Sequence, residues 1–222
     1  MIKKIKHLEL FAGIGGFRSA IDLYCKDNKL ISECVGFSEI DKYAVKSYKA
    51  NFDIKNEVEI GDIDSFTKQR KLVKKLPDFD LLTAGFPCQA FSMMGRKLGF
   101  EDSRGNIFYA IIKVLQVKKP KYVLLENVRN LTRHDNGNTF IEITRSLRED
   151  AGYTVFNDVF NTSDFGLPQT RRRVFLLAIR NDLDSIINDI TFEAKEVKRE
   201  FNHLNGSTNL RNFENVLDGV LE

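Results

Sequence analysis

Cys88 is the residue in this sequence whose type and setting most suggest chemistry. It follows Pro87 at the end of an apolar run, in FDLLTAGFPCQAFS, residues 79–92. A cysteine in an apolar run is commonly a small buried hydrophobe. The polar segment GRKLGFEDSRGN, residues 95–106, follows it here. A cysteine beside such a loop is a candidate nucleophile that needs activation, because only a few per cent of a free thiol is ionised at neutral pH.

Two further motifs place charge next to apolar strands. Glu126 follows four apolar residues in YVLLENV, residues 122–128, so in a dry site it must pair, protonate or donate a hydrogen bond. QTRRR, residues 169–173, begins a later strand in which Arg171 and Arg173 share a face. Each motif alone could be a satisfied strand-end acid or a solvated basic patch. With Cys88 they predict a nucleophile, a proton donor and fixed cations on one rim.

A glycine-rich motif, LELFAGIGGF at residues 8–17, predicts a strand, a tight turn and a helix. Gly13, Gly15 and Gly16 would let the backbone approach a ligand at the helix N-terminus, the usual place for a nucleotide-like cofactor in such a sheet. The dinucleotide pattern GxGxxG would need a glycine where Arg18 stands, so a bound pyrophosphate is not expected. A purely structural turn that needs glycines is the alternative interpretation.

Acidic residues follow the next two predicted strands. Glu39 in FSEID lies about where such folds place a carboxylate on ribose hydroxyls, and Asp62 in GDI lies where an adenine amino group could be bound. Either acid alone is more often a helix cap or a solvated charge. With the glycine turn they predict an adenosine-containing ligand without a diphosphate.

The elements that position these residues alternate along the chain. Apolar runs predict strands at 7–11, 34–40, 58–60, 79–84 and 122–125, and helical periodicity predicts helices near 17–24, from 41, at 66–76 and at 108–115. This alternation is typical of a three-layer α/β sheet with parallel central strands. Two strands with no helix between them, 153–160 and 173–179, predict an antiparallel pair at one edge. From residue 181 the sequence is polar, with no strong element expected until 213–221.

Composition limits the class of protein. The 222 residues are 42% hydrophobic, enough for one domain, and the net charge of +3 gives no overall field that favours nucleic acid. Three cysteines without a CxxC suit a reduced cytosol better than a disulfide or zinc framework, so no metal site is expected. The N-terminus does not read as a signal peptide and no apolar run approaches the roughly 18 residues of a membrane span, which predicts a soluble, cytoplasmic protein.

Taken together, the motifs resemble those of the DNA cytosine-5 methyltransferase family, in the family's usual order over about residues 8–180. The matching stretches are FAGIGG, FSEID, GDI, GFPCQAFS, GFEDSRG, ENV and QxRxR. The resemblance implies a Rossmann-like sandwich with a mostly parallel seven-stranded sheet. It also implies a catalytic and cofactor-binding domain at 1–180, with 181–222 connecting toward a target-recognition domain that is absent from this chain.

The resemblance implies S-adenosyl-L-methionine as cofactor. Phe11 and the three glycines would surround its methionine part, Glu39 would bind the ribose, and Ile40 would lie against the adenine. Asp62 and Ile63 would contact the polar edge of the adenine, and Pro87 would border the pocket. Ile40 stands where many members carry an aromatic residue, and Glu9 stands where aspartate is common, so both are departures from the family pattern.

The resemblance also implies catalytic roles. Cys88 would add to carbon 6 of a flipped-out cytosine, Glu126 would hold nitrogen 3 and the exocyclic amine, and Arg173 with Arg171 would bind the carbonyl at carbon 2. The substrate side and the lid over it, residues 87–106, would include Gln89, Ser92 and Arg104.

Several functions remain open at this point. The expected partners are duplex DNA, within a restriction-modification system, and a C-terminal half or second subunit that carries target recognition. A related group methylates transfer RNA. A non-catalytic subunit that retains the fold would have no need for the full set of Cys88, Glu126, Arg171 and Arg173, and a nucleotide-dependent oxidoreductase is disfavoured by Arg18. The isolated chain is expected to bind DNA weakly and without specificity.

Overall fold

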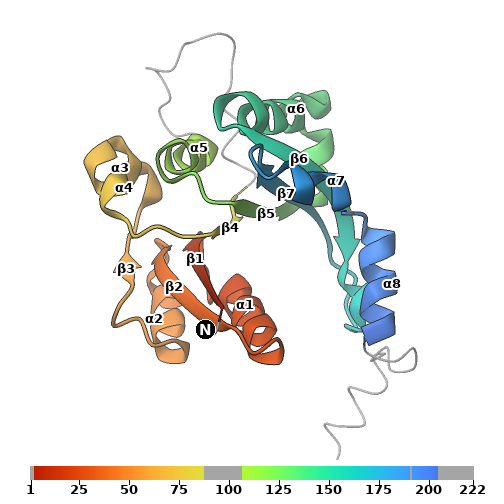
Figure 1. Ribbon diagram of the computed structural model, residues 1–222, viewed down its shortest axis with the longest axis horizontal. Coiled ribbons are helices and arrows are strands. Elements are labelled where there is room, and N and C mark those ends of the chain that lie inside the picture. Colours follow the sequence, from red (N-terminus) through yellow and green to blue (C-terminus); the bar gives the residue numbers. More distant parts are fainter. Residues whose placement is uncertain (1–2, 88–106, 191, 205–222) are drawn as a thin grey trace, which may run out of the picture.

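The computed structural model describes residues 3–87, 107–190 and 192–204. A seven-stranded sheet with the order β3-β2-β1-β4-β5-β7-β6 forms its centre (Figure 1). The strands are β1 (Lys4–Leu10), β2 (Ile31–Ser38), β3 (Val58–Glu59), β4 (Leu81–Gly85), β5 (Tyr122–Val128), β6 (Tyr153–Asn161) and β7 (Arg172–Arg180). Strands β1 to β5 are parallel to one another, whereas β7 is antiparallel to both β5 and β6. The predicted fold class, including the antiparallel pair at one edge, is confirmed.

Helices cover both faces of this sheet (Figure 1). Helices α1 (Gly16–Asp27) and α2 (Lys42–Asn51) lie on one face. The other face carries α3 (Ile63–Lys68), α4 (Arg70–Lys75), α5 (Ile107–Lys118) and α6 (Asn138–Arg145). The shorter or later elements are η2 (Arg129–Gly137), η3 (Ser146–Asp150), η4 (Thr162–Phe165), α7 (Asp184–Asp189) and α8 (Ala194–Leu204). The two helical layers and the sheet give the three layers that the sequence predicts.

The two faces of the sheet differ in how completely they are covered. On the α5 side, Val123 and Leu125 of β5 are fully buried in a core that also contains Phe108 and Ile111 of α5. The alternate residues of β5 point to the opposite face, where Leu124 and Glu126 are only half-buried. The α1 side of β5 and β7 therefore retains accessible surface next to the predicted site.

Two sequence-based expectations are wrong. The helix predicted at 66–76 is two short helices, because the backbone leaves the helical region at Gln69, which ends α3 and precedes α4. The segment after residue 181 was expected to lack a strong element, yet α7 and α8 form there; residues 213–221 lie outside the described ranges. Tertiary contacts explain α8: the Ala194 N–H donates to Asp158 Oδ2 at 2.7 Å, and Lys198 pairs with Asp164 at 2.9 Å. Packing of this kind overrides a weak local pattern.

Within these ranges, none of the helices has the length and apolar character that crossing a membrane would require.

Candidate active site

One edge of the sheet gathers most of the predicted site residues. Strands β1, β2, β4 and β5 are parallel and end there, and the antiparallel β7 begins there, with Arg173 opposite Val128 of β5. The glycine turn, Glu39, Pro87, Glu126 and the arginines therefore lie along this edge. Four predicted residues fall outside the described part of the chain: Cys88, Gln89, Ser92 and Arg104.

The glycine turn after β1 is open toward its surroundings. A Cβ atom added at Gly13 or Gly16 would meet no atom within 4 Å, whereas one at Gly15 would lie 2.2 Å from the Phe52 ring. Gly15 is thus required for packing, and the other two leave room for a ligand to approach the backbone. Phe11 has a φ of 55°. This backbone conformation is rare for a bulky residue and is found most often at functional sites.

Glu39 fixes this turn from the end of β2. Its Oε2 accepts a hydrogen bond from the Gly13 N–H at 2.8 Å, and its Oε1 accepts from the N–H groups of Ile40 and Asp41 at 2.8 and 2.9 Å. Ile40 beside it is 72% exposed, which leaves an apolar side chain available to a ligand. The predicted roles in ribose and adenine binding stay predictions, although both side chains lie next to the open turn.

The residues after β3 are engaged locally. Asp62 caps α3 by accepting from the Asp64 N–H at 3.0 Å and from the Ser65 hydroxyl at 2.6 Å. The hydrogen bond from Ser65, more than that from Asp64, holds the pKa of Asp62 below its usual value. The Ile63 side chain is buried, so only its backbone could face a ligand. The helix-cap interpretation of Asp62 is thus realised, and contact of Asp62 or Ile63 with adenine stays a prediction.

Arg18, which replaces the third glycine of a dinucleotide pattern, has a structural place. Its guanidinium donates to Glu57 Oε1 at 2.7 Å, pairs with Asp22 at 3.0 Å and lies 5.2 Å from the centre of the Phe52 ring. The side chain is only 11% exposed. An ion-paired, largely buried arginine therefore stands at the position where the dinucleotide pattern has its third glycine.

Asn127 fixes the segment that leads to Cys88, a role that the sequence analysis did not assign. It is buried, and its Nδ2 donates to the carbonyl of Phe86 at 2.8 Å. Phe86 is itself buried, with its ring 5.7 Å from that of Phe108, and Pro87 is exposed. The sequence signal that could have indicated this role is Asn127 itself, an amide residue on the buried side of the largely apolar strand β5. Such a group must find a hydrogen-bond partner.

Glu126 and Arg173 form the central ion pair of this edge. Arg173 Nε lies 2.8 Å from Glu126 Oε1, and the two side chains are 21% and 22% exposed. Gly85 borders the carboxylate, and a Cβ there would lie 3.5 Å from Glu126 Oε2, an ordinary van der Waals distance. Arg173 also donates from Nη1 to the carbonyl of Arg172 at 2.9 Å. The structure thus brings Arg173 to Glu126, with both still accessible to a ligand.

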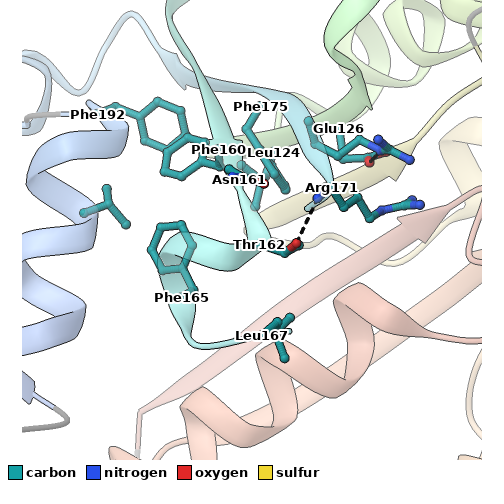
Figure 2. Close-up of a pocket in the computed structure, with 12 residues that line it drawn as sticks. Leu124, Glu126, Phe160, Asn161, Thr162, Phe165, Leu167, Arg171, Phe175 and Phe192 are labelled. Carbon is teal, nitrogen blue, oxygen red and sulfur yellow. Dashed lines mark hydrogen bonds and ion pairs between the residues drawn. The ribbon is translucent and has the colours of Figure 1, made fainter. Parts of the chain in front are cut away.

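A largely apolar pocket of about 400 Å³ adjoins this pair (Figure 2). Glu126, Arg171 and Arg173 form its polar side. Four phenylalanine rings line the rest: Phe160, Phe165, Phe175 and Phe192. Arg171 is exposed and is held through its backbone N–H, which donates to Thr162 Oγ1 at 3.1 Å. Thr162 was also not singled out from the sequence.

Residues 5–219 of the chain match the family of C-5 cytosine-specific DNA methylases. The chain belongs to this family. Two similar members are the type II methyltransferases M.HhaI of Haemophilus parahaemolyticus, 43% identical over 180 residues, and M.HaeII of Haemophilus aegyptius, 46% identical over 183 residues. The matches cover 81% and 82% of this chain but 50% and 52% of those proteins. This C-5 cytosine-specific DNA methylase chain thus spans about half the length of the curated relatives it matches.

Solved structures agree on the fold of this methylase chain. The Dnmt2 methyltransferase of S. pombe superposes with a TM-score of 0.62 at 24% identity, covering 88% of this chain and 55% of that one. A DNMT2 mutant of Spodoptera frugiperda gives 0.58 at 28% identity, covering 81% and 51%. Both similarities again cover about half of the longer protein.

Proposed function

We propose that this chain is the catalytic half of a DNA (cytosine-5)-methyltransferase, which transfers a methyl group from S-adenosylmethionine to carbon 5 of a cytosine in duplex DNA. The observation that carries the proposal is the accessible Glu126–Arg173 pair, at the same sheet edge as the open glycine turn and Pro87, the residue before Cys88. The type II methyltransferases that are 43–46% identical to it favour DNA as the substrate.

The residues of the glycine turn fit the cofactor that the family and fold imply. When bound, S-adenosylmethionine supplies the methyl group. The open space at Gly13 and Gly16 would admit the methionine part, and Glu39 and the exposed Ile40 would hold the ribose and adenine. Asp62 and the backbone of Ile63 would contact the edge of the adenine. A dinucleotide is disfavoured, because Arg18, paired with Glu57, stands where the dinucleotide pattern has its third glycine.

The side chains would make carbon 5 of cytosine reactive through a covalent detour. Carbon 5 is a poor nucleophile, so the Cys88 thiolate adds to carbon 6, forming a sulfur–carbon bond and moving electron density to carbon 5. Glu126 shares a proton with nitrogen 3 and so neutralises charge as the thiolate adds. After methylation, carbon 5 loses its proton and the sulfur–carbon bond breaks, which restores the aromatic ring and the thiolate.

The arginines would hold the base in place for these steps. Arg173 orients Glu126 through their ion pair, and it can donate to the carbonyl at carbon 2 of the base together with Arg171. The target atoms are inaccessible within a stacked duplex, so the cytosine must leave the helix at a cost of about a few kcal/mol. Arg173 therefore both positions Glu126 and binds the flipped base.

We further propose that a C-terminal half, or a second subunit, covers the pocket of Figure 2. The chain spans half of its relatives, and the pocket exposes phenylalanine and leucine side chains beside the Glu126–Arg173 pair. Leu23 and Tyr24 of α1, 59% and 57% exposed, add apolar surface on the same face of the sheet. Activity of the chain should therefore rise when the C-terminal half of a relative such as M.HaeII is supplied in trans, and Phe175→Ser should abolish that gain.

The decisive experiment is intact-mass analysis of the chain after incubation with S-adenosylmethionine and duplex DNA that contains 5-fluorocytosine. Fluorine cannot leave as the proton does, so a completed transfer leaves the DNA bonded to the protein. An adduct that Cys88→Ala removes is the expected result. The same incubation with transfer RNA separates the alternative substrate. If no adduct forms with either nucleic acid, even with a C-terminal half supplied, the proposed function is wrong.

A further inference from the structure

Glu9 is a fully buried carboxyl group beneath the glycine turn. It lies in β1 between Phe37 of β2 and Thr83 of β4, and its exposure is 0%. Burying a carboxylate is costly unless hydrogen bonds or charges compensate it. No residue in the described ranges forms an ion pair with Glu9. Hydrogen bonds must therefore compensate for the burial of its carboxyl group.

The contacts of Glu9 connect it to helix α1. Helix α1 begins at Gly16 after Gly15, which has no side chain to cap the first N–H groups. Glu9 Oε1 accepts instead from the Arg18 N–H at 3.4 Å, and Glu9 Oε2 accepts from the Tyr48 hydroxyl at 3.2 Å. A carboxylate at this end of a helix also interacts favourably with the helix dipole. Glu9 in β1 thus accepts a hydrogen bond from the first turn of α1, as the side chain of an N-cap residue would.

Burial raises the pKa of Glu9 to about 7, while the hydrogen bonds from the Arg18 N–H and the Tyr48 hydroxyl act in the opposite direction. The titratable or charged groups around it come from β1 itself, from α1, β2 and α2, and from the segment before β3: His7, Arg18, Asp22, Cys34, Tyr48 and Glu57. Burial lowers the pKa of His7 to about 4 and raises that of Cys34 to about 12, so both are neutral near pH 7. Arg18 is cationic and paired with Glu57 and Asp22.

We propose that Glu9 is a positioning residue of the cofactor site, whose ionised carboxylate holds the N-terminus of α1 and the glycine turn in the form that binds cofactor. This inference rests on the proposed function, because it takes the open turn as the cofactor site. It assigns Glu9 to the geometry of the turn and not to contact with the ligand. Ionisation of Glu9 and cofactor binding are then coupled, and each favours the other.

Ionisation of Glu9, which would favour cofactor binding, should lower the stability of the chain measured without cofactor. A carboxyl group whose pKa is raised on folding contributes stability that is present below its unfolded pKa of 4.5 and is lost as the pH rises through about 7. Ionised Glu9 therefore destabilises the free chain at pH 8 while it prepares the turn for binding. A residue with a merely structural role would not show this exchange of stability for affinity.

The test is isothermal titration of the 222-residue chain with S-adenosylmethionine at pH 6, 7 and 8, comparing wild type with Glu9→Gln. If binding needs ionised Glu9, wild-type affinity rises about tenfold from pH 6 to pH 8 and binding at pH 7 releases up to about half a proton. Glu9→Gln should lose both effects, and Glu9→Asp should restore them. The ligand's own titration is common to all variants and cancels in the comparison.

Two further variants keep the test independent of folding problems at position 9. Tyr48→Phe removes a hydrogen bond that favours the carboxylate, so the rise in affinity should move to higher pH. Glu33→Gln, at the opposite edge of the sheet, is the matched control and should leave the profile unchanged. Thermal unfolding at pH 8 should give Glu9→Gln a melting temperature higher than that of wild type.

The outcomes separate this inference from the proposed function. A wild-type chain that binds S-adenosylmethionine with the same pH profile as Glu9→Gln would overturn the role of Glu9 and leave the proposed function standing. A Glu9→Gln chain that binds normally but is less stable than wild type at pH 8 would show a structural role only. A wild-type chain that fails to bind S-adenosylmethionine at any of the three pH values would count against the cofactor assignment and this inference together.

Discussion

At the edge of the sheet where β4 and β5 begin, basic side chains are paired with carboxylates. Lys4 pairs with Glu33 at 2.5 Å, Lys121 with Asp80 at 2.9 Å, and Lys118 with Asp78. At the edge where the same strands end, Arg129, Arg171 and Arg172 form no ion pair with any residue of the described ranges. The sheet therefore has one edge with satisfied charges and one edge with available cations.

The second edge also holds several locally unfavourable features, although Lys29 and Lys119, just before β2 and β5 at the first edge, have a positive φ as well. Phe11 has a positive φ, Glu9 is buried with a raised pKa, and Gly13 and Gly16 face open space. Proteins retain such features where function requires them and compensate elsewhere. Under the proposed function, the edge where the strands end serves binding and catalysis, so equivalent substitutions at the two edges should have different effects.

The largest difference is expected for the carboxylate of an ion pair at each edge. Glu126→Gln should lower the rate of adduct formation by roughly 10²–10⁴-fold, because it removes the group proposed to share a proton with the base. Its stability should change by less than about 1 kcal/mol, since the pair is partly solvent-exposed. Asp80→Asn, which breaks the Lys121 pair, should leave the rate unchanged. Equal rates for the two variants would remove the basis for calling the ending edge catalytic.

A smaller effect is expected at Asn127, whose substitution should lower both the free energy of unfolding and the rate of adduct formation. Asn127→Leu leaves the buried Phe86 carbonyl without its donor, which should cost about 1–3 kcal/mol in denaturant unfolding. Adduct formation should also slow under conditions where the variant is fully folded, because Phe86 lies two residues before Cys88. If only stability falls and the folded variant reacts at the wild-type rate, Asn127 holds the core and does not position the nucleophile.

The elements of this fold follow from sequence where local pattern and burial agree. The strands β4 and β5 were predictable because an apolar run continues through each of them, as is typical of strands in the middle of a sheet. The division at Gln69 and the formation of α8 were not, since the first depends on backbone angles at one residue and the second on contacts with Asp158 and Asp164 that are distant in sequence.

For the site as well, the sequence predicts which residues are present but not how they contact one another. The sequence indicates which charged residues lie at strand ends, so Glu39, Glu126 and Arg173 could be named in advance. It could not show that Glu39 binds the turn or that Arg173 reaches Glu126, because both depend on the register between neighbouring strands. Glu9 was noted only as a departure from aspartate, since a sequence pattern carries no information on burial or on the pKa that burial produces.

The smallest expected effect concerns the cations themselves. Arg129 follows Val128, whose register partner is Arg173, so Arg129 and Arg172 emerge at the same edge. If DNA lies against this edge, Arg129→Gln and Arg172→Gln should each reduce the slope of log affinity against log salt by about 1, because each arginine neutralises about one phosphate. Arg180→Gln at the beginning edge should not change the slope, because Arg180 is paired with Asp182 at 2.5 Å. Equal slopes for all three variants would place the DNA elsewhere and leave the unpaired arginines as ordinary solvated charges.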